Sequence, residues 1–509
     1  RLLRNRHNGR FADVSESARL TSVPPASGLT FVDYDHDGDL DLYLTRSAAG
    51  LAEFEAAKAE VADSHGTLLR NNGNGTFTDV TEETGLGSRG GVVALASDVN
   101  NDRAVDFVIT GGGSAPAGAK AGSAAGARGI PPAGTKESAA ARSEAAGKEM
   151  QGRGSEAPQV FLNPREGKFW AAELWAAAMP APTVAAVALD FNKDGWMDLA
   201  FTHSGAPGVS LWRNVEGKKF ERVALPELHL KRGFGVAAFD YDNDGWVDLA
   251  VAGESESGGG VRLLRNAGPQ GFKDVSAEVG LDKLKLNNPR ALLAVDYDND
   301  GASDLLITQH DGPPVLLRNE GGAKNGSVRL ALKGLNDNKS ALGTKVEVFA
   351  GPLWQKFEVS GSGYMGQSVA PPVAGLGSAG QADIVRLLWP TGVVQDEVEF
   401  ERGGTVQINE IDRRGSSCPI VFVWDGTRYR FIADMIGAGV IGHWIAPGQR
   451  NMPDPTEYMK VAGALVRPRR GRLSFRLMEP MEEAVYLDQV RLLAVDHPRD
   501  AQAFPNEYF

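Results

Sequence analysis

Short apolar runs recur along the chain in pairs, and each pair encloses a stretch rich in aspartate. The run "GVAAF" leads into Asp240 and "DLAVAG" starts at Asp248, while "ALLAV" leads into Asp296 and "DLLIT" starts at Asp304. Apolar runs of about four to seven residues bounded by turn residues are typical of strands rather than helices. The pattern therefore predicts a repeating unit of strand, acidic loop and strand.

A second element follows the acidic loops and consists of an apolar run, an Asn-Gly type of turn and a run that begins with an aromatic residue. It is clearest at Leu68, where the chain reads "LLRNNGNGTFTDV", and at Leu263, where it reads "LLRNAGPQGFKDV". The same element opens the chain at Leu2 without a preceding acidic loop. This pattern indicates a β-hairpin, so one unit is predicted to hold roughly four strands.

The spacing of the units indicates their architecture. Acidic loops begin at Asp190, Asp240 and Asp296, which are 50 and 56 residues apart. A four-stranded unit that repeats at about 50 residues is the pattern of a β-propeller blade, whereas a parallel β-helix has much shorter repeats and tandem sandwiches have longer ones. Five loop-bearing blades and an N-terminal half-unit are visible, so the number of blades stays open.

The chain divides into three predicted domains, all of them β. Residues 1–322 hold the propeller, with an insertion at about 111–157 that is rich in Gly, Ala and Ser. That insertion buries too little apolar surface to offset its chain entropy, so it is predicted to be disordered. Residues 323–412 alternate apolar and polar side chains, which predicts a small β-sandwich. Residues 413–509 are predicted to form an additional β-rich domain.

The acidic loops share oxygen-bearing side chains at positions 1, 3, 5 and 9. Such closely spaced carboxylates repel one another unless a cation lies among them. Ca²⁺ takes about six to eight oxygen ligands in flexible geometry, whereas Mg²⁺ demands a strict octahedron and keeps its waters. The loops therefore predict up to five calcium sites. The candidate ligands are Asp33, Asp35, Asp37, Asp41, Asp98, Asn100, Asp102, Asp106, Asp190, Asn192, Asp194, Asp198, Asp240, Asp242, Asp244, Asp248, Asp296, Asp298, Asp300 and Asp304.

One loop departs from this pattern. Four loops have Gly at position 6, but the loop at 98–106 has Arg103 there. Its positive charge would lie beside the cage, so weak or no metal binding is predicted at this loop. A single Asp-rich turn could equally be a solvated loop, but five in matched strand context favour metal.

Composition limits the classes of protein that fit. The 509 residues are 42% hydrophobic, and the formal net charge of -12 argues against a nucleic-acid partner. Cys418 is the only cysteine, which excludes an intramolecular disulfide and a cysteine-based metal site. No run approaches the roughly 20 apolar residues of a membrane helix, so an integral membrane protein is not expected. The chain starts at Arg1 within a repeat pattern, so a leader or a further domain is expected to precede it.

The motifs resemble two known modules. The repeated "DxDxDGxxDL" loop between short strands is similar to the FG-GAP/VCBS repeat of integrin-type and bacterial extracellular propellers, over residues 1–320. Residues 325–410 resemble the ASPIC/UnbV domain through "GTKVEVFAG", the "GLG" at 375–377 and the "WPTG" that starts at Trp389. That domain accompanies such repeats in the cartilage acidic protein family and its bacterial relatives, where an aromatic residue or His often precedes Gly-Leu-Gly. Here the chain reads "PPVAGLG", so no role for that His is carried over.

The resemblance implies a secreted, periplasmic or cell-surface calcium-binding protein with a role in adhesion or scaffolding. No Gly-x-Ser-x-Gly, His-Glu-x-x-His, phosphate-binding loop or cysteine-nucleophile pattern is present, so a non-catalytic module that binds a protein or glycan is favoured. The alternative is a calcium-dependent lyase or hydrolase that acts on an extracellular polymer or phosphoester. Its site would lie at the central channel of the propeller.

Overall fold

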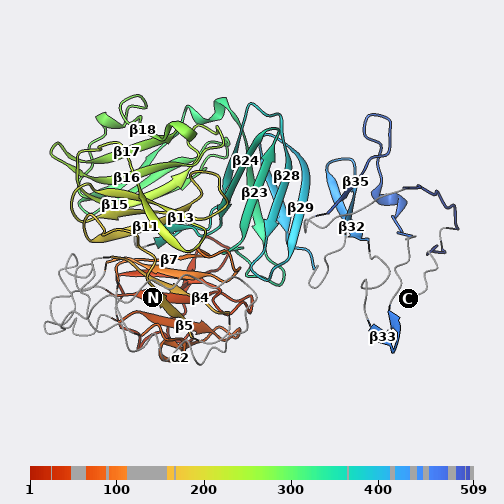
Figure 1. Ribbon diagram of the computed structural model, residues 1–509, viewed down its shortest axis with the longest axis horizontal. Helices are drawn as coiled ribbons and strands as arrows, with labels where there is room; N and C mark the ends of the chain where they lie inside the picture. Colours follow the sequence, from red (N-terminus) through yellow and green to blue (C-terminus); the bar gives the residue numbers. More distant parts are fainter. Residues whose placement is uncertain are drawn as a thin grey trace.

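A computed structural model of the protein describes residues 1–24, 26–46, 65–87, 91–111, 157–165, 168–363, 366–412, 419–435, 444–450, 458–479, 489–498 and 500–504. This part of the chain is nearly all β and is built from many small antiparallel sheets (Figure 1). The insertion predicted to be disordered, at about 111–157, lies outside the described residues except at its ends.

Five antiparallel sheets follow one another in the repeat part of the chain, and within each sheet the strands pair in chain order. The first two sheets consist of β3 (Gly28–Val32), β4 (Asp41–Thr45), β5 (Thr67–Asn71) and β6 (Phe77–Asp79), and of β7 (Ala94–Ser97), β8 (Asp106–Ile109), β9 (Gln159–Leu162) and β10 (Trp170–Ala172). The third and fourth consist of β11 (Thr183–Leu189), β12 (Asp198–His203), β13 (Val209–Val215) and β14 (Lys219–Val223), and of β15 (Leu230–Phe239), β16 (Asp248–Ser255), β17 (Gly258–Asn266) and β18 (Phe272–Asp274). The fifth has three strands, β19 (Pro289–Val295), β20 (Asp304–Gln309) and β21 (Gly312–Leu317).

Neighbouring sheets share hydrophobic cores. Val187 and Leu211 of the third sheet pack with Val236 and Leu249 of the fourth, and all four side chains are buried. The second strands of the first four units are largely covered on both faces, and β12 is buried along its whole length. This two-sided burial explains why the second strands read as continuous apolar runs rather than alternating ones.

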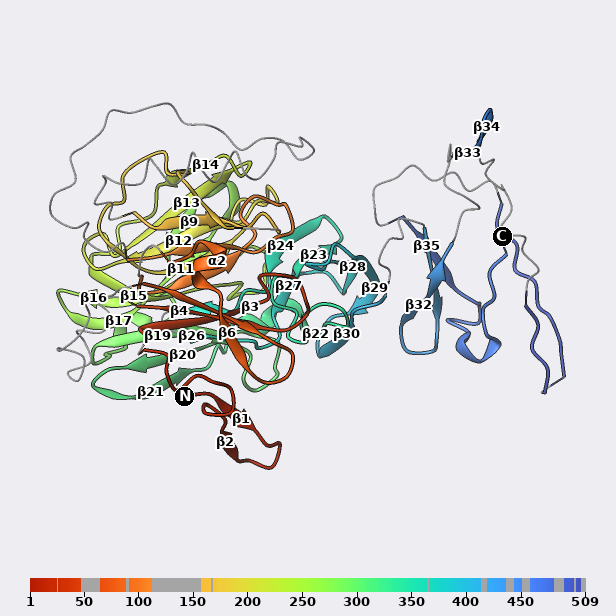
Figure 2. The same cartoon turned by 90° about the horizontal axis from the view of Figure 1, so that it is seen from below.

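The two ends of the repeat part differ from the four-stranded pattern. The N-terminal hairpin, β1 (Leu3–Asn5) and β2 (Phe11–Asp13), forms a two-stranded sheet of its own, and Figure 2 shows it standing out from the other sheets. The fifth sheet ends at β21, because the segment after Leu317 continues into the second part instead of forming an aromatic strand. A short helix, α2 (Thr81–Thr84), follows β6.

The second part of the protein, residues 326–409, contains two sheets around one core. One sheet has the order β27-β22-β30 and the other the order β24-β23-β28-β29. Val328, Val346, Trp389 and Ile408 belong to the shared core. The strands are β22 (Gly326–Lys333), β23 (Lys345–Ala350), β24 (Leu353–Glu358), β27 (Val373–Gly377), β28 (Gln381–Leu388), β29 (Val394–Glu401) and β30 (Thr405–Asn409).

A small hairpin of the second part reaches the first strands of the repeat part. It consists of β25 (Ser362–Gly363) and β26 (Gly366–Gln367), and it contacts β3, β11, β15 and β19. The Gln367 side chain accepts a hydrogen bond from the Phe31 amide at 2.8 Å and donates one to the Phe31 carbonyl at 3.1 Å. One side chain thus satisfies both polar backbone groups of Phe31.

The C-terminal part lies beyond β29 at one end of the molecule (Figures 1 and 2). Its largest sheet has the order β32-β31-β35, and Ile420 and Phe422 pack against Val398 of β29. A separate hairpin lies between the second and third of these strands along the chain. The strands are β31 (Ile420–Trp424), β32 (Tyr429–Asp434), β33 (Trp444–Ala446), β34 (Gln449–Arg450) and β35 (Phe475–Met478).

Candidate metal sites

The acidic loops lie between the first and second strands of the five sheets, in the same place each time. They span 33–41, 98–106, 190–198, 240–248 and 296–304, and the residue at position 9 opens the second strand. That residue also pairs with the last residue of the first strand, as Asp248 does with Phe239. All the predicted ligands therefore lie in five equivalent loops.

The aspartate at position 9 is held by backbone amides. Asp248 accepts hydrogen bonds from the Asn266 amide at 2.7 Å and from the Tyr241 amide at 2.9 Å. The same pair of bonds recurs at Asp41, Asp106, Asp198 and Asp304. Because the amides come from the hairpin and from the start of the loop, position 9 ties each hairpin to its acidic loop.

The aspartate at position 1 shapes the turn. Asp240 accepts hydrogen bonds from the Asp244 amide at 3.0 Å and from the Gly245 amide at 2.7 Å. Gly245 has a φ of +88°, in the left-handed region that suits glycine. In the loop at 98–106, Arg103 takes the matching position with a φ of 72°, so this loop keeps the turn at a cost in backbone strain.

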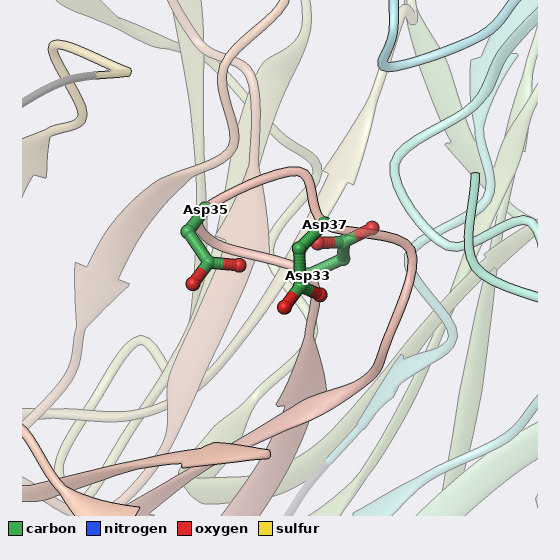
Figure 3. A group of neighbouring side chains, drawn as sticks. All are labelled: Asp33, Asp35 and Asp37. Atoms are coloured by element: carbon green, nitrogen blue, oxygen red, sulfur yellow. The ribbon is translucent and has the colours of Figure 1, made fainter. Parts of the chain in front are cut away.

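Three loops gather carboxylates closely enough to hold one metal ion. In each, three carboxylate oxygens from different residues lie within 4.8 Å of one another. Figure 3 shows the cluster of the first loop, where all three side chains come from the turn between β3 and β4. The clusters are Asp33, Asp35 and Asp37; Asp240, Asp242 and Asp248; and Asp296, Asp298 and Asp300.

Buried oxygens without a hydrogen-bond donor indicate which of these clusters would fit a cation. Oδ1 of Asp33, Asp35 and Asp242 is buried without a hydrogen-bond partner in the described part of the protein. A buried carboxylate oxygen with no donor is costly, and a hard divalent cation, which prefers oxygen ligands, would satisfy it. The clusters at 33–41 and 240–248 therefore fit a metal ion.

Burial changes the acid–base chemistry of the loops. Burial, reinforced by the charges of Asp37 and Asp35, raises the pKa of Asp33 to about 7. Burial also raises the pKa of Asp41 to about 8, although backbone hydrogen bonds oppose this change. At the third loop it raises the pKa of Asp198 to about 9. A bound cation would favour the ionised forms, so metal binding would release protons.

The loops at 98–106 and 190–198 have asparagine at position 3. The Asn100 amide group donates to Asp102 at 2.9 Å, and the Asn192 amide group donates to Asp194 at 2.7 Å. Asparagine oxygens also bind calcium, so position 3 does not itself exclude a metal from either loop. These loops have two carboxylates among positions 1, 3 and 5, one fewer than the others.

Arginines of the hairpins also contact the loops, and sequence reasoning missed them. Arg265 donates to Oδ2 of Asp242 at 2.8 Å and to Oδ2 of Asp244 at 2.7 Å. Arg318 makes the equivalent bonds to Asp298 and Asp300 in the last loop. The sequence did hold a signal for these arginines, because the pair "RN" recurs at the same place in several hairpins.

The asparagine of that "RN" pair links neighbouring units. The Asn214 side-chain amide donates to the Val99 carbonyl of the preceding loop at 2.8 Å and to the Met197 carbonyl of its own loop at 3.0 Å. Asn266 and Asn319 make the corresponding pairs of bonds, and so does Asn163, which follows Leu162 instead of an arginine. The hairpins therefore join each acidic loop to the one before it.

The second part of the protein covers the acidic loops. At the first loop, a Cβ on Gly38 would lie 2.6 Å from the Asn336 carbonyl oxygen, so the two parts touch there. The other loops are joined to the second part by hydrogen bonds. Lys345 donates to Asp98, and Lys356 donates to the Gly195 carbonyl at 3.0 Å. The Gly377 amide donates to the Asn243 carbonyl at 2.8 Å, and the Ser327 hydroxyl donates to the Gly301 carbonyl at 2.6 Å.

Solved structures give only weak likenesses. An Agrocybe aegerita lectin, described as recognising non-reducing terminal N-acetylglucosamine, is 16% identical over 63% of this chain and 76% of the lectin, with a TM-score of 0.36. The Photorhabdus luminescens Tc holotoxin pore is 16% identical over 58% of this chain and 11% of the toxin chain, with a TM-score of 0.26. The V. cholerae biofilm matrix protein Bap1 is 10% identical over 72% of this chain and 58% of its own, with a TM-score of 0.25. TM-scores this low do not establish a shared fold.

Sequence families give clearer matches. A search of curated proteins gave no match, and none of the helices among the described residues has the length and apolar character needed to span a membrane. The family described as FG-GAP-like repeat matches residues 190–251 and 240–307, across the third, fourth and fifth acidic loops. The family described as ASPIC and UnbV matches residues 334–415. The chain therefore contains FG-GAP-like repeats and an ASPIC and UnbV domain.

Proposed function

We propose that the chain is an extracellular or cell-surface calcium-binding β-propeller that acts as a non-catalytic binding, adhesion or scaffold module. In this proposal the five sheets of the repeat part are blades and the second part is a small β-sandwich. The order of the sheets, their shared cores and the contacts between their first strands support radial packing. FG-GAP-like repeats are typical of extracellular proteins, which supports a location outside the cytoplasm.

The observation that carries the calcium proposal is the clustering of carboxylates at equivalent loops. Three loops place three carboxylate oxygens within 4.8 Å of one another. Oδ1 of Asp33, Asp35 and Asp242 is also buried without a hydrogen-bond donor in the described residues. Calcium suits such sites better than magnesium, because it accepts more ligands in less regular geometry. The loop at 190–198 is assigned to calcium as well, through Asp190, Asn192, Asp194 and Asp198.

The ions would act on stability and on the joint between the repeat part and the second part. A cation bound to position 1 of a loop holds the turn that joins two strands, so its binding energy becomes folding energy. Because the second part covers the same loops, ordering them also orders its docking surface. Calcium would thus lock these two regions of the protein into a single rigid module.

The proposed partner is a protein or glycan rather than a nucleic acid, since the net charge is -12. The enzyme alternative receives less support. A cavity of about 180 Å³ lies where β11, β15 and β19 meet the second part, and Ala238, Leu292, Phe357 and Val359 are among its lining residues. At the first strands, where the site of the enzyme alternative would lie, this cavity is below the roughly 300–1,000 Å³ of typical ligand pockets, so we favour the binding role.

Calcium titration of the stripped full chain tests the proposal. We expect calorimetric binding of several ions per chain, and a melting temperature that falls sharply when a chelator removes them. Asp240→Asn should lower the number of bound ions by one. Asp282→Asn, at an exposed aspartate outside the acidic loops, is the control and should leave that number unchanged. A stripped protein that binds no calcium and melts at the same temperature as the untreated one would contradict the proposal.

A further inference from the structure

Lys345 of the second part inserts its ammonium group into the acidic loop at 98–106. Its Nζ lies 2.8 Å from Oδ2 of Asp98 and 3.2 Å from the Asp98 carbonyl oxygen, and it also donates to Oδ1 of Asn101. The Lys345 and Asp98 side chains are each only 3% exposed. A positive charge therefore already lies at position 1 of this loop.

A second residue of the same sheet also contacts the start of this loop. Glu358 is the strand partner of Lys345 across β23 and β24. Its carboxylate accepts hydrogen bonds from the Ser97 hydroxyl at 2.5 Å and from the Asp98 amide at 3.1 Å. Lys345 and Glu358 thus hold the start of the loop between an ammonium and a carboxylate that come from adjacent strands.

Both carboxylate oxygens of Asp98 also accept hydrogen bonds from within the loop. Oδ1 of Asp98 accepts from the Asp102 amide at 3.1 Å, and Oδ2 accepts from the Arg103 amide at 2.8 Å. The buried oxygens without donors that mark the loops at 33–41 and 240–248 have no counterpart among the described side chains of this loop. The loop therefore does not fit a metal ion as the other two do.

The neighbouring loop at 190–198 gives a chemically matched comparison. It has the same acid and amide side chains at positions 1, 3, 5 and 9, and Lys356 of the second part also reaches it. That lysine donates to the Gly195 carbonyl at 3.0 Å rather than forming an ion pair with Asp190. The difference between these two loops is thus the place of the ammonium, which meets the first carboxylate at 98–106 and not at 190–198. In the last loop the Arg329 guanidinium lies 3.6 Å from Oδ2 of Asp296.

We propose that the Lys345 ammonium takes the place of a divalent ion in the loop at 98–106 and makes this loop a metal-independent attachment point of the second part. An ammonium at hydrogen-bond distance from Asp98 repels a divalent ion at the same carboxylate. A buried charge that loses its partner is strongly destabilising, so the pair also fixes where the second part sits. The contrast with the other loops rests on the calcium proposal above.

The first test counts calcium in full-length variants after stripping and reloading. Asp98→Asn and Asp240→Asn each change the position-1 carboxylate of one loop. We expect Asp98→Asn to leave the number of bound ions at the wild-type value, while Asp240→Asn lowers it by one. A loss of one ion in Asp98→Asn would overturn the inference. If the wild type binds no calcium, the calcium proposal fails, and the inference is judged on the second test.

The second test is a double-mutant cycle in metal-free protein. Lys345→Met and Asp98→Asn should each lower the melting temperature, because each leaves a buried charge or polar group unpaired. The double variant should melt higher than the sum of the two single losses predicts. Additive losses would overturn the inference.

Discussion

The side-chain amide of Asn266 donates a hydrogen bond to the carbonyl oxygen of Phe191, which belongs to the preceding acidic loop, 2.8 Å away. Asn266 is 1% exposed, and its amide also donates to Val247 of its own loop at 3.1 Å. The residue therefore connects two units that are also joined by apolar packing and by the hydrogen bond from the Thr202 hydroxyl to the Phe234 carbonyl. Truncation would leave two backbone carbonyls without their donor.

Asn266→Ala should lower the free energy of unfolding by about 2–3 kcal/mol, because buried hydrogen-bond partners are left unsatisfied. Asn71→Ala is the matched control. Asn71 holds the same place in its hairpin but donates to Leu40 of its own loop, so its loss should be smaller. Urea unfolding followed by fluorescence measures both, and equal losses would contradict a role in joining units.

Gly375→Ala should separate the second part from the loop at 240–248. A Cβ on Gly375 would lie 2.0 Å from Oδ2 of Asp240 and 2.6 Å from the Cα of Asn243. Backbone cannot move aside easily, so we expect a loss of about 1–3 kcal/mol and weaker calcium binding at this loop. Gly380→Ala meets no atom within 4 Å and serves as the control. The variants are compared by unfolding and by calcium titration, and equal behaviour would contradict the contact.

Glu410→Ala should loosen the turn that covers the first acidic loop. One carboxylate oxygen of Glu410 accepts hydrogen bonds from the amides of Leu335 at 2.6 Å, Asn336 at 2.9 Å and Asp337 at 3.0 Å. Hydrogen bonds to a charged group contribute more than neutral ones, so the loss should reach about 2–4 kcal/mol. Glu401→Ala, at an exposed residue of β29, should change the unfolding midpoint little.

The stability of metal-free protein should fall as the pH rises from 6.5 to 9. The folded-state pKa values of Asp33, Asp41 and Asp198 are raised by burial to about 7, 8 and 9, whereas the unfolded values lie near 3.8. A raised carboxyl pKa means that the folded state holds protons the unfolded state has lost. Stability is therefore present at low pH and is lost as the pH passes the folded pKa, by up to about 1.4 kcal/mol per pH unit for each group.

This window avoids the opposite effect of the buried histidines. Burial lowers the pKa of His36 and His203 to about 4, so their influence on stability is confined below their unfolded value of 6.5. Calcium should flatten the dependence of stability on pH above pH 6.5, because the bound ions keep the loop carboxylates ionised throughout this range. Thermal melts of stripped and calcium-loaded protein across this range test it, and a metal-free protein that gains stability toward pH 9 would contradict the assignment.

The sequence predicted the local structure of the chain better than it predicted the contacts between its parts. The acidic loops and their flanking strands could be expected because apolar runs, turn residues and the period of the repeat are local signals. Lys345 could not be assigned to Asp98, because 247 residues separate them and one buried lysine gives no periodic signal. Arg103 looked like the cause of weak metal binding, yet the structure places a second cation at the first carboxylate of the same loop.

The pairing of Gln367 with Phe31 has a consequence for association between chains. β3 is the end strand of its sheet, and an unpaired strand edge is a template to which a strand of another molecule can add. The amide of Gln367 meets both the N–H and the C=O of Phe31, as an added strand would. A single side chain of the second part thus blocks edge-to-edge aggregation at this point of β3, so docking of that part also protects the repeat part from self-association.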